Sequence, residues 1–108
     1  MIELTKNEEL ILLTILRLKE NAYGVTIRKL FMEITDKELN FGSMYNTLYL
    51  LVRRGLISSE KSAPESKKGG KRKKLYTLTS EGMEALKHAQ QVQKLAWSGI
   101  PDLGVEEE

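Results

Sequence analysis

Residues 67–74, with the sequence KKGGKRKK, constrain the fold more than any other segment. Six of the eight are basic and two are glycines, so this segment cannot be buried in a core. Short apolar segments lie on both sides of it, at 56–57 and 75–78. This pattern predicts a β-hairpin with strands at 56–61 and 73–78 and a cationic tip. Such a tip is suited to contact a polyanion.

The net positive charge of the chain is confined to this hairpin. The chain as a whole has a net charge of +2. Residues 58–74 contain seven basic and two acidic side chains, a net +5, which leaves −3 on the remainder. A charged patch on a slightly acidic body indicates a phosphate-binding surface. The alternative is a solvated, irregular run of charge, and the strand-like segments on both sides argue against it.

Length and composition indicate one globular domain, which we place at residues 1–97, followed by a flexible tail at 98–108. The chain contains no cysteine, so disulfides and thiolate metal sites are excluded, and a reducing cytoplasmic location is expected. The longest apolar run, from Leu10 to Leu16, is far shorter than the roughly 20 residues of a membrane span. The first residues do not resemble a secretion signal. We therefore expect no membrane partner.

Helix signals precede and follow the predicted hairpin. Thr5 and Glu8 have the spacing of a capping box, Gly55 is a typical helix stop, and Thr79 is a candidate N-cap. Apolar periodicity predicts helices that begin after Thr5 and after Thr79, with two more at about 23–35 and 42–54. The last helix is expected to end at 96–97. The predicted fold class is mainly α with a small antiparallel β-hairpin: a winged helix-turn-helix with three helices, the hairpin and a fourth helix.

The first helix has a wider apolar surface than one core needs. From Leu10 to Leu18 its apolar residues cover nearly the full circumference. The helix is therefore either central in the domain or in contact with a second subunit. Because a domain of this size has little room for a central helix, we favour an oligomer.

Helix 42–54 is predicted to be the reading helix of the helix-turn-helix motif. A reading helix anchors one face in the core and presents the other to base edges in the major groove of double-stranded DNA. Asn46 is suited to adenine, Arg53 to guanine or phosphate, and Ser43 to a phosphate near the helix start. Tyr45 and Tyr49 offer phenolic donors to the DNA backbone, although each is about as well explained as a half-buried packing residue. The full set of candidate DNA contacts is Tyr23, Ser43, Tyr45, Asn46, Tyr49 and Arg53 in the helices, with Lys67, Lys68, Lys71, Arg72 and Lys73 in the wing.

Four motifs in this order resemble the PadR family of regulators. They are AYG at 22–24, GSMY at 42–45 followed by Leu48, RGLI at 54–57, and KRKKLYTLTSEG at 71–82. Together they cover about residues 5–96. Asn46 departs from the pattern, because the family usually has proline there, and Tyr49 replaces a basic or small polar residue.

The resemblance implies a dimeric bacterial transcriptional repressor of the short type, which binds an operator near its own promoter. It also implies a homodimer formed by the first and last helices. The candidate interface residues are Leu10, Leu13, Leu86, Val92, Leu95 and Trp97. Short members include regulators that bind flat aromatic compounds between their dimer helices, which makes Trp97 a candidate effector contact, although a packing anchor is the more common role of such a residue. A winged helix used only for protein contacts is a further alternative, and its binding would lack a steep salt dependence.

An enzymatic function is not expected. His88 is the only histidine, and no motif places an acid–base partner beside it. The glycine pair at 69–70 lacks the surrounding residues of a phosphate-binding loop, and no cluster has metal-ligand spacing. We expect no cofactor and no bound metal.

Overall fold

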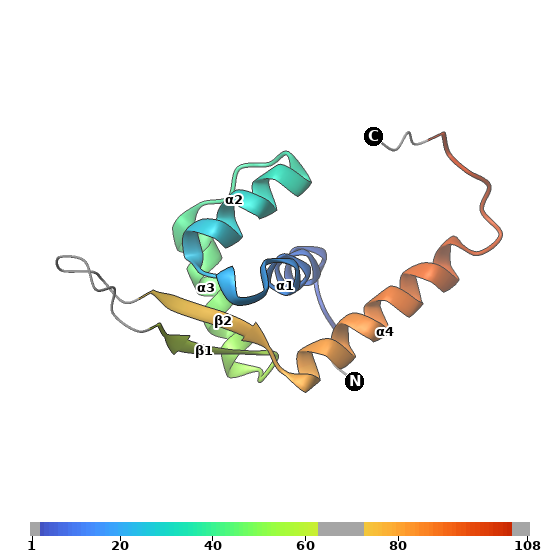
Figure 1. Ribbon diagram of the computed structural model, residues 1–108. Helices are drawn as coiled ribbons and strands as arrows, with labels where there is room; N and C mark the ends of the chain where they lie inside the picture. The colour runs from blue at the N-terminus through green and yellow to red at the C-terminus, as the bar shows by residue number, and fades with distance from the viewer. Residues whose placement is uncertain (1–2, 63–72, 105–108) are drawn as a thin grey trace.

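The structure, a computed structural model, describes residues 3–62 and 73–104. Its elements are α1 (Lys6–Leu18), a 3-10 turn (Lys19–Asn21), α2 (Gly24–Thr35), α3 (Phe41–Arg53), β1 (Ile57–Lys61), β2 (Lys74–Leu78) and α4 (Ser80–Trp97). The predicted order of helices, hairpin and last helix is confirmed (Figure 1). The wing residues Lys67, Lys68, Lys71 and Arg72 lie outside the described residues.

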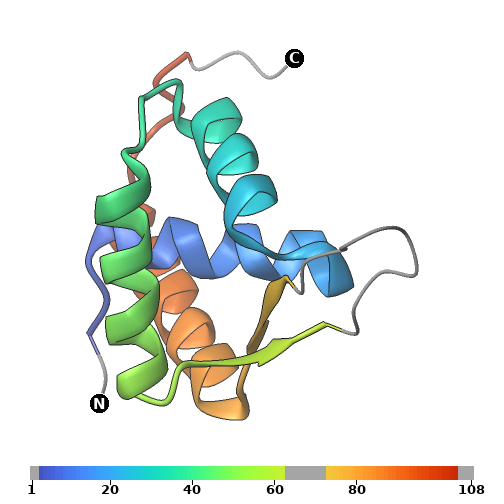
Figure 2. The same cartoon turned by 90° about the vertical axis from the view of Figure 1, so that its left-hand side faces the viewer.

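Helix α1 lies in the middle of the domain. Figure 2 shows it running between α2 on one side and the hairpin and α4 on the other. Ile11, Leu12 and Ile15 are at most 1% exposed. Leu10 and Leu13 are partly buried and pack against the same core. Most of the wide apolar surface of α1 is therefore covered within one chain, so the expectation that a domain of this size has little room for a central helix is wrong.

The helix caps explain where the helices begin. Thr5 and Glu8 form the predicted capping box, with the Glu8 N–H donating to Thr5 Oγ1 at 3.1 Å and the Thr5 N–H donating to Glu8 Oε1 at 2.8 Å. The Thr79 side chain caps α4 as predicted. Helix α3 begins at Phe41, one residue earlier than predicted, because the Asn40 side chain accepts a hydrogen bond from the Ser43 N–H at 3.1 Å.

The helix α2 likewise differs by one residue from its predicted start, because Tyr23 is its extended N-cap and not its first helical residue. The two strands pair antiparallel, with Ile57 opposite Leu78 and Lys61 opposite Lys74. Each strand begins one residue later than predicted. The Tyr76 N–H donates to the Ala22 carbonyl at 2.9 Å, which ties the hairpin to the start of α2.

The hairpin and α4 meet at the end of α3. Gly55 has a φ of +76°, as its predicted position after the helix requires. The Thr79 N–H donates to the Leu56 carbonyl at 3.1 Å, and Thr79 Oγ1 donates to the Gly55 carbonyl at 2.6 Å. Gly82 lies so close to this turn that a Cβ atom there would collide with the Leu56 carbonyl oxygen. A side chain at position 82 would therefore force α4 and this turn to move apart.

Helix α4 extends away from the rest of the domain (Figure 1). Its first half contributes Gly82, Ala85 and Leu86 to the buried interior. Its second half exposes Val92, Leu95 and Trp97, at 50%, 68% and 51%. Within residues 3–62 and 73–104, no helix combines the length and the apolar character that crossing a membrane requires.

Candidate nucleic-acid interface

Helix α3 has one buried face and one exposed face. Met44, Leu48 and Leu51 are 0% exposed and anchor the helix in the core. The other face carries the side chains that the sequence assigned to DNA contact, all of them exposed: Ser43, Tyr45, Asn46, Tyr49 and Arg53. The helical periodicity therefore predicted correctly which side of α3 is exposed to solvent.

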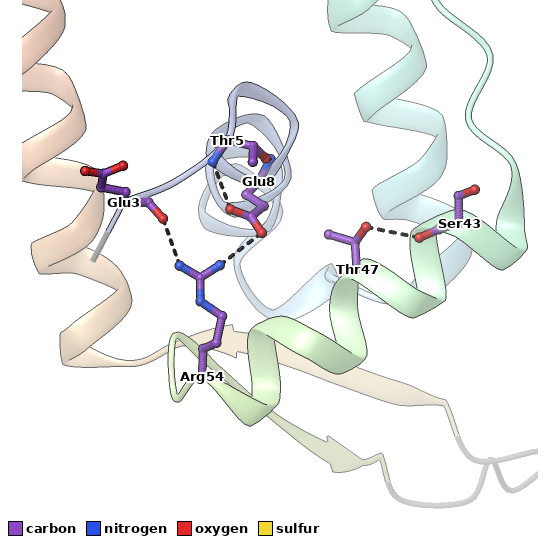
Figure 3. Close-up of polar contacts among 6 residues, drawn as sticks. All are labelled: Glu3, Thr5, Glu8, Ser43, Thr47 and Arg54. Carbon is purple, nitrogen blue, oxygen red and sulfur yellow. Dashed lines mark hydrogen bonds and ion pairs between the residues drawn. The ribbon is translucent and has the colours of Figure 1, made fainter. Parts of the chain in front are cut away.

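One backbone N–H group in the first turn of α3 is bonded to the cap of the helix. The Asn40 side chain accepts a hydrogen bond from the Ser43 N–H. This amide is therefore not free to bind the phosphate that the sequence assigned to Ser43. The Ser43 hydroxyl remains on the exposed face, and the Ser43 carbonyl accepts a hydrogen bond from Thr47 Oγ1 at 3.1 Å (Figure 3). The capping role of Asn40 was not predicted, although asparagine three residues before Ser43 is a recognisable N-cap signal.

Tyr45 has a packing contact in addition to its exposed surface. A Cβ atom on Gly24 would collide with the Tyr45 hydroxyl, so the tyrosine lies directly against the start of α2. Its ring also stacks on Phe41, with 6.2 Å between the ring centroids. Burial, and to a lesser extent the neighbouring Tyr45, raises the pKa of Tyr76 above its ordinary value. These contacts favour the packing role of Tyr45 that the sequence left open.

The last turn of α3 carries two arginines with different surroundings. Arg53 lies on the exposed face, where its Nη1 donates to the Tyr49 hydroxyl at 3.3 Å. Arg54 instead turns toward the start of the chain, with Nη1 2.9 Å from Glu8 Oε2 and Nη2 donating to the Glu3 carbonyl at 2.8 Å (Figure 3). Arg54 therefore stabilises the fold, and Arg53 presents its guanidinium to solvent beside Tyr49.

The base of the wing brings two predicted residues together. Lys73 Nζ lies 4.2 Å from the centre of the Tyr23 ring, a cation–π contact. The Lys73 N–H donates to Ser62 Oγ at 2.9 Å, and the Lys73 carbonyl accepts from the Ser62 N–H at 2.7 Å. The start of β2 thus contacts Tyr23, the residue next to the Gly24 that contacts Tyr45.

A sequence model of the family described as "Transcriptional regulator PadR-like family" matches residues 12–88. The chain belongs to the PadR-like family. This match covers α2, α3 and the hairpin, and so it includes the interface described above.

Solved structures agree with this assignment. A PadR family transcription regulator from Clostridium difficile R20291 is 31% identical, with a TM-score of 0.67 over 82% of this chain and 88% of that chain. A PadR-like transcription factor from Bacteroides fragilis is 26% identical, with a TM-score of 0.66 over 83% of this chain and 82% of that one. A PadR-like regulator from Bacillus cereus, at 24% identity and a TM-score of 0.73, supports the fold over 94% of this chain and 93% of that chain. Comparison with functionally curated proteins gives no match.

The predicted interface residues of this PadR-like chain fall into two groups. Leu86 is part of the domain core, and Leu10 and Leu13 pack against that core, so their own chain accounts for most of their burial. Val92, Leu95 and Trp97 are exposed on α4. Assignment of all six to a dimer, and of Trp97 to an effector site, stays a prediction. In the part of the chain that the structure describes, no group of three metal-ligating side chains is found.

Proposed function

We propose that this chain is a sequence-specific double-stranded DNA-binding regulator that acts as a homodimer and represses transcription. The observation that carries the proposal is the exposed polar face of α3, fixed by a fully buried opposite face and followed by a hairpin whose described base carries Lys61, Lys73 and Lys74. In a winged helix, these two surfaces contact one duplex together.

The two surfaces would make different contributions to binding. Asn46 and Arg53 are exposed and of the types that bind adenine and guanine edges in a bidentate manner. The wing at 61–74 supplies cations to the phosphate backbone or the minor groove, which increases affinity without selecting a sequence. Family membership supports the regulatory role, because the matching family consists of transcriptional regulators.

The dimer is proposed from the surfaces that one chain leaves uncovered. A groove between α1 and α4 is lined by the apolar residues Leu13, Leu16 and Met83 and by polar residues that include Glu9 and Gln90. The outer half of α4 exposes Val92, Leu95 and Trp97. A second copy that inserts its α4 into this groove would cover both surfaces, and the resulting dimer would carry two copies of α3.

The experiment is fluorescence anisotropy with the duplex upstream of the gene and a scrambled duplex, over a range of salt concentrations. Tighter binding to the promoter duplex, with a steep salt dependence on both, is expected. Binding that is equal on both duplexes would contradict sequence specificity at this site. Binding without a salt dependence would contradict a DNA-binding role for the wing.

Two variants separate the wing from the reading helix. Replacing Lys67, Lys68, Lys71 and Arg72 with alanine should lower the affinity for both duplexes equally. It should also reduce the slope of log affinity against log salt concentration by about one for each lost phosphate contact. The matched control replaces three lysines and one arginine that are exposed outside α3, the hairpin and α4: Lys6, Arg17, Lys29 and Lys37. The two variants have the same net charge, so a difference between them reports the position of the charge.

Asn46→Ala should weaken binding to the promoter duplex by about 1–3 kcal/mol and leave binding to the scrambled duplex unchanged. Asn7→Ala, an exposed asparagine on α1, is the matched control. Equal weakening of both duplexes by Asn46→Ala would identify a backbone contact instead of a base contact.

A further inference from the structure

One side chain of α2 makes three contacts with the segment that leads into α3. Arg28 Nε donates to the Leu39 carbonyl at 2.6 Å, and Nη2 lies 3.6 Å from Glu38 Oε1. The guanidinium carbon lies 4.5 Å from the centre of the Phe41 ring. Arg28 therefore binds the last residues of the connection and the first residue of α3 at once.

The contacts continue along the exposed side of α3 and return to α2. Phe41 stacks on Tyr45, with an angle of 19° between the rings, and Tyr45 lies against Gly24. We call Arg28, Phe41 and Tyr45 the Arg28 stack. It bridges α2 and α3 at the surface, because Phe41 and Tyr45 are 42% and 45% exposed.

The Arg28 stack holds the part of α3 that carries Ser43 and Asn46. The opposite face of the helix is already fixed in the core by fully buried residues. The stack therefore adds little to folding itself, since exposed cation–π contacts are weak. The stack matters more for the position of the recognition side chains than for stability, because such a side chain has to be held within about 0.5 Å of its productive position.

We propose that Arg28 is a positioning residue for base discrimination. It fixes the first turn of α3 through the Leu39 carbonyl and the Phe41 ring, so that Asn46 meets base edges in one geometry. The inference rests on the proposed DNA-binding function. Lysine cannot substitute, because it lacks the planar group that stacks on a ring while donating in the plane.

The test compares Arg28→Ala, Arg28→Lys and the control Arg17→Ala, which removes an exposed arginine from α1. Anisotropy would be measured on a duplex selected from a random library by the wild-type protein and on a scrambled duplex. Arg28→Ala should lose about tenfold in affinity for the selected duplex, the size of one impaired bidentate contact. Affinity for the scrambled duplex and the salt slope should stay as in the wild type, and Arg28→Lys should behave like Arg28→Ala.

Other outcomes would overturn the proposal. If Arg28→Ala bound both duplexes more weakly to the same extent, with a shallower salt slope, Arg28 would contact a phosphate directly. Full recovery with lysine would mean that positive charge alone is sufficient. Unchanged discrimination by Arg28→Ala would mean that the stack does not position α3.

A measurement without DNA separates this proposal from the proposed function. Amide hydrogen exchange should be faster in Arg28→Ala at Ser43 to Thr47, with exchange at the core positions of α1 unchanged. Failure of the wild-type protein to discriminate between duplexes would sink the proposed function. Unchanged exchange at the start of α3 would sink the positioning role, whatever the wild-type protein binds.

Discussion

The two ends of α3 are held by different kinds of contact. At the carboxyl end, backbone contacts act beside the Arg54–Glu8 ion pair: the Leu56 carbonyl accepts from Thr79, and its oxygen lies where a side chain at Gly82 would have to go. At the amino end, side chains make the connection, through Arg28, Phe41 and Tyr45. Backbone groups cannot move without moving whole elements, whereas the far end of a side chain can shift within its rotamers.

This difference assigns distinct roles to the two ends. The carboxyl end fixes how α3, the hairpin and α4 come together, and so it determines the fold. The amino end carries Ser43 and Asn46 and determines how a helix that is already folded is oriented. Changes at the first end should therefore act on stability, and equivalent changes at the second should act on ligand discrimination.

Gly82→Ala is expected to have the largest effect on stability. The new methyl group would meet the Leu56 carbonyl oxygen, and relief requires α4 to move away from the hairpin. Such overpacking against backbone should cost about 3 kcal/mol. The measurement is urea unfolding followed by circular dichroism. Gln91→Ala, an exposed change on the same helix, is the control, and an equally small effect of both variants would refute the close junction.

Gly24→Ala is the matched change at the other end. The new methyl group would meet the Tyr45 hydroxyl, which is the far end of a side chain, so the cost should be only about 1 kcal/mol. In a Tyr45→Ala background the same change should become neutral or stabilising, because alanine favours a helix over glycine. The contrast between the two ends would disappear if Gly24→Ala lost as much stability as Gly82→Ala, or if the loss persisted in the Tyr45→Ala background.

The sequence predicted the parts of this comparison that depend on local signals. The capping box of Thr5 and Glu8, the turn at Gly55 and the cap at Thr79 each depend on residues within one turn of each other. The exposed face of α3 followed from helical periodicity. The one-residue errors at the starts of α2 and α3 concern caps, where the side chain that accepts the first hydrogen bond sets the boundary.

The sequence could not predict the contacts between distant segments. Arg54 and Glu8 are 46 positions apart, and nothing local distinguishes Arg54 from Arg53. Likewise, the contact of Tyr45 with Gly24 depends on how α2 and α3 cross. The sequence also left two interpretations of α1 open and favoured contact with a second subunit over a central position, because an apolar circumference is the same whether this chain or a second one covers it.

The pair of Arg54 and Glu8 allows a quantitative test at the carboxyl end. Both side chains are partly exposed, at 35% and 20%, so their coupling should be about 1 kcal/mol and should decrease with salt. Glu8→Gln removes the charge and keeps a residue that can close the capping box. A double-mutant cycle with Arg54→Ala measures the coupling. The exposed pair of Lys87 and Glu84 should give a value near zero, and equal values for the two pairs would mean that Arg54 does not tie α3 to α1.

Tyr76 gives the smallest expected effect and links the hairpin to the amino end of α3. Its pKa is raised by burial and by Tyr45, so the folded state keeps the phenol neutral to a higher pH than the unfolded state does. The stability that this difference contributes is fully present below the unfolded value of about 10 and is lost as the pH rises through the folded value. Tyr76→Phe has no phenol to ionise at this position, so it should lose less stability than the wild type between pH 8 and pH 11. Urea unfolding at each pH measures this loss, and all other titrating groups are the same in the two proteins. Parallel loss in the two proteins would show that Tyr76 ionises as easily in the folded state as in the unfolded one, and therefore that neither burial nor Tyr45 affects its hydroxyl.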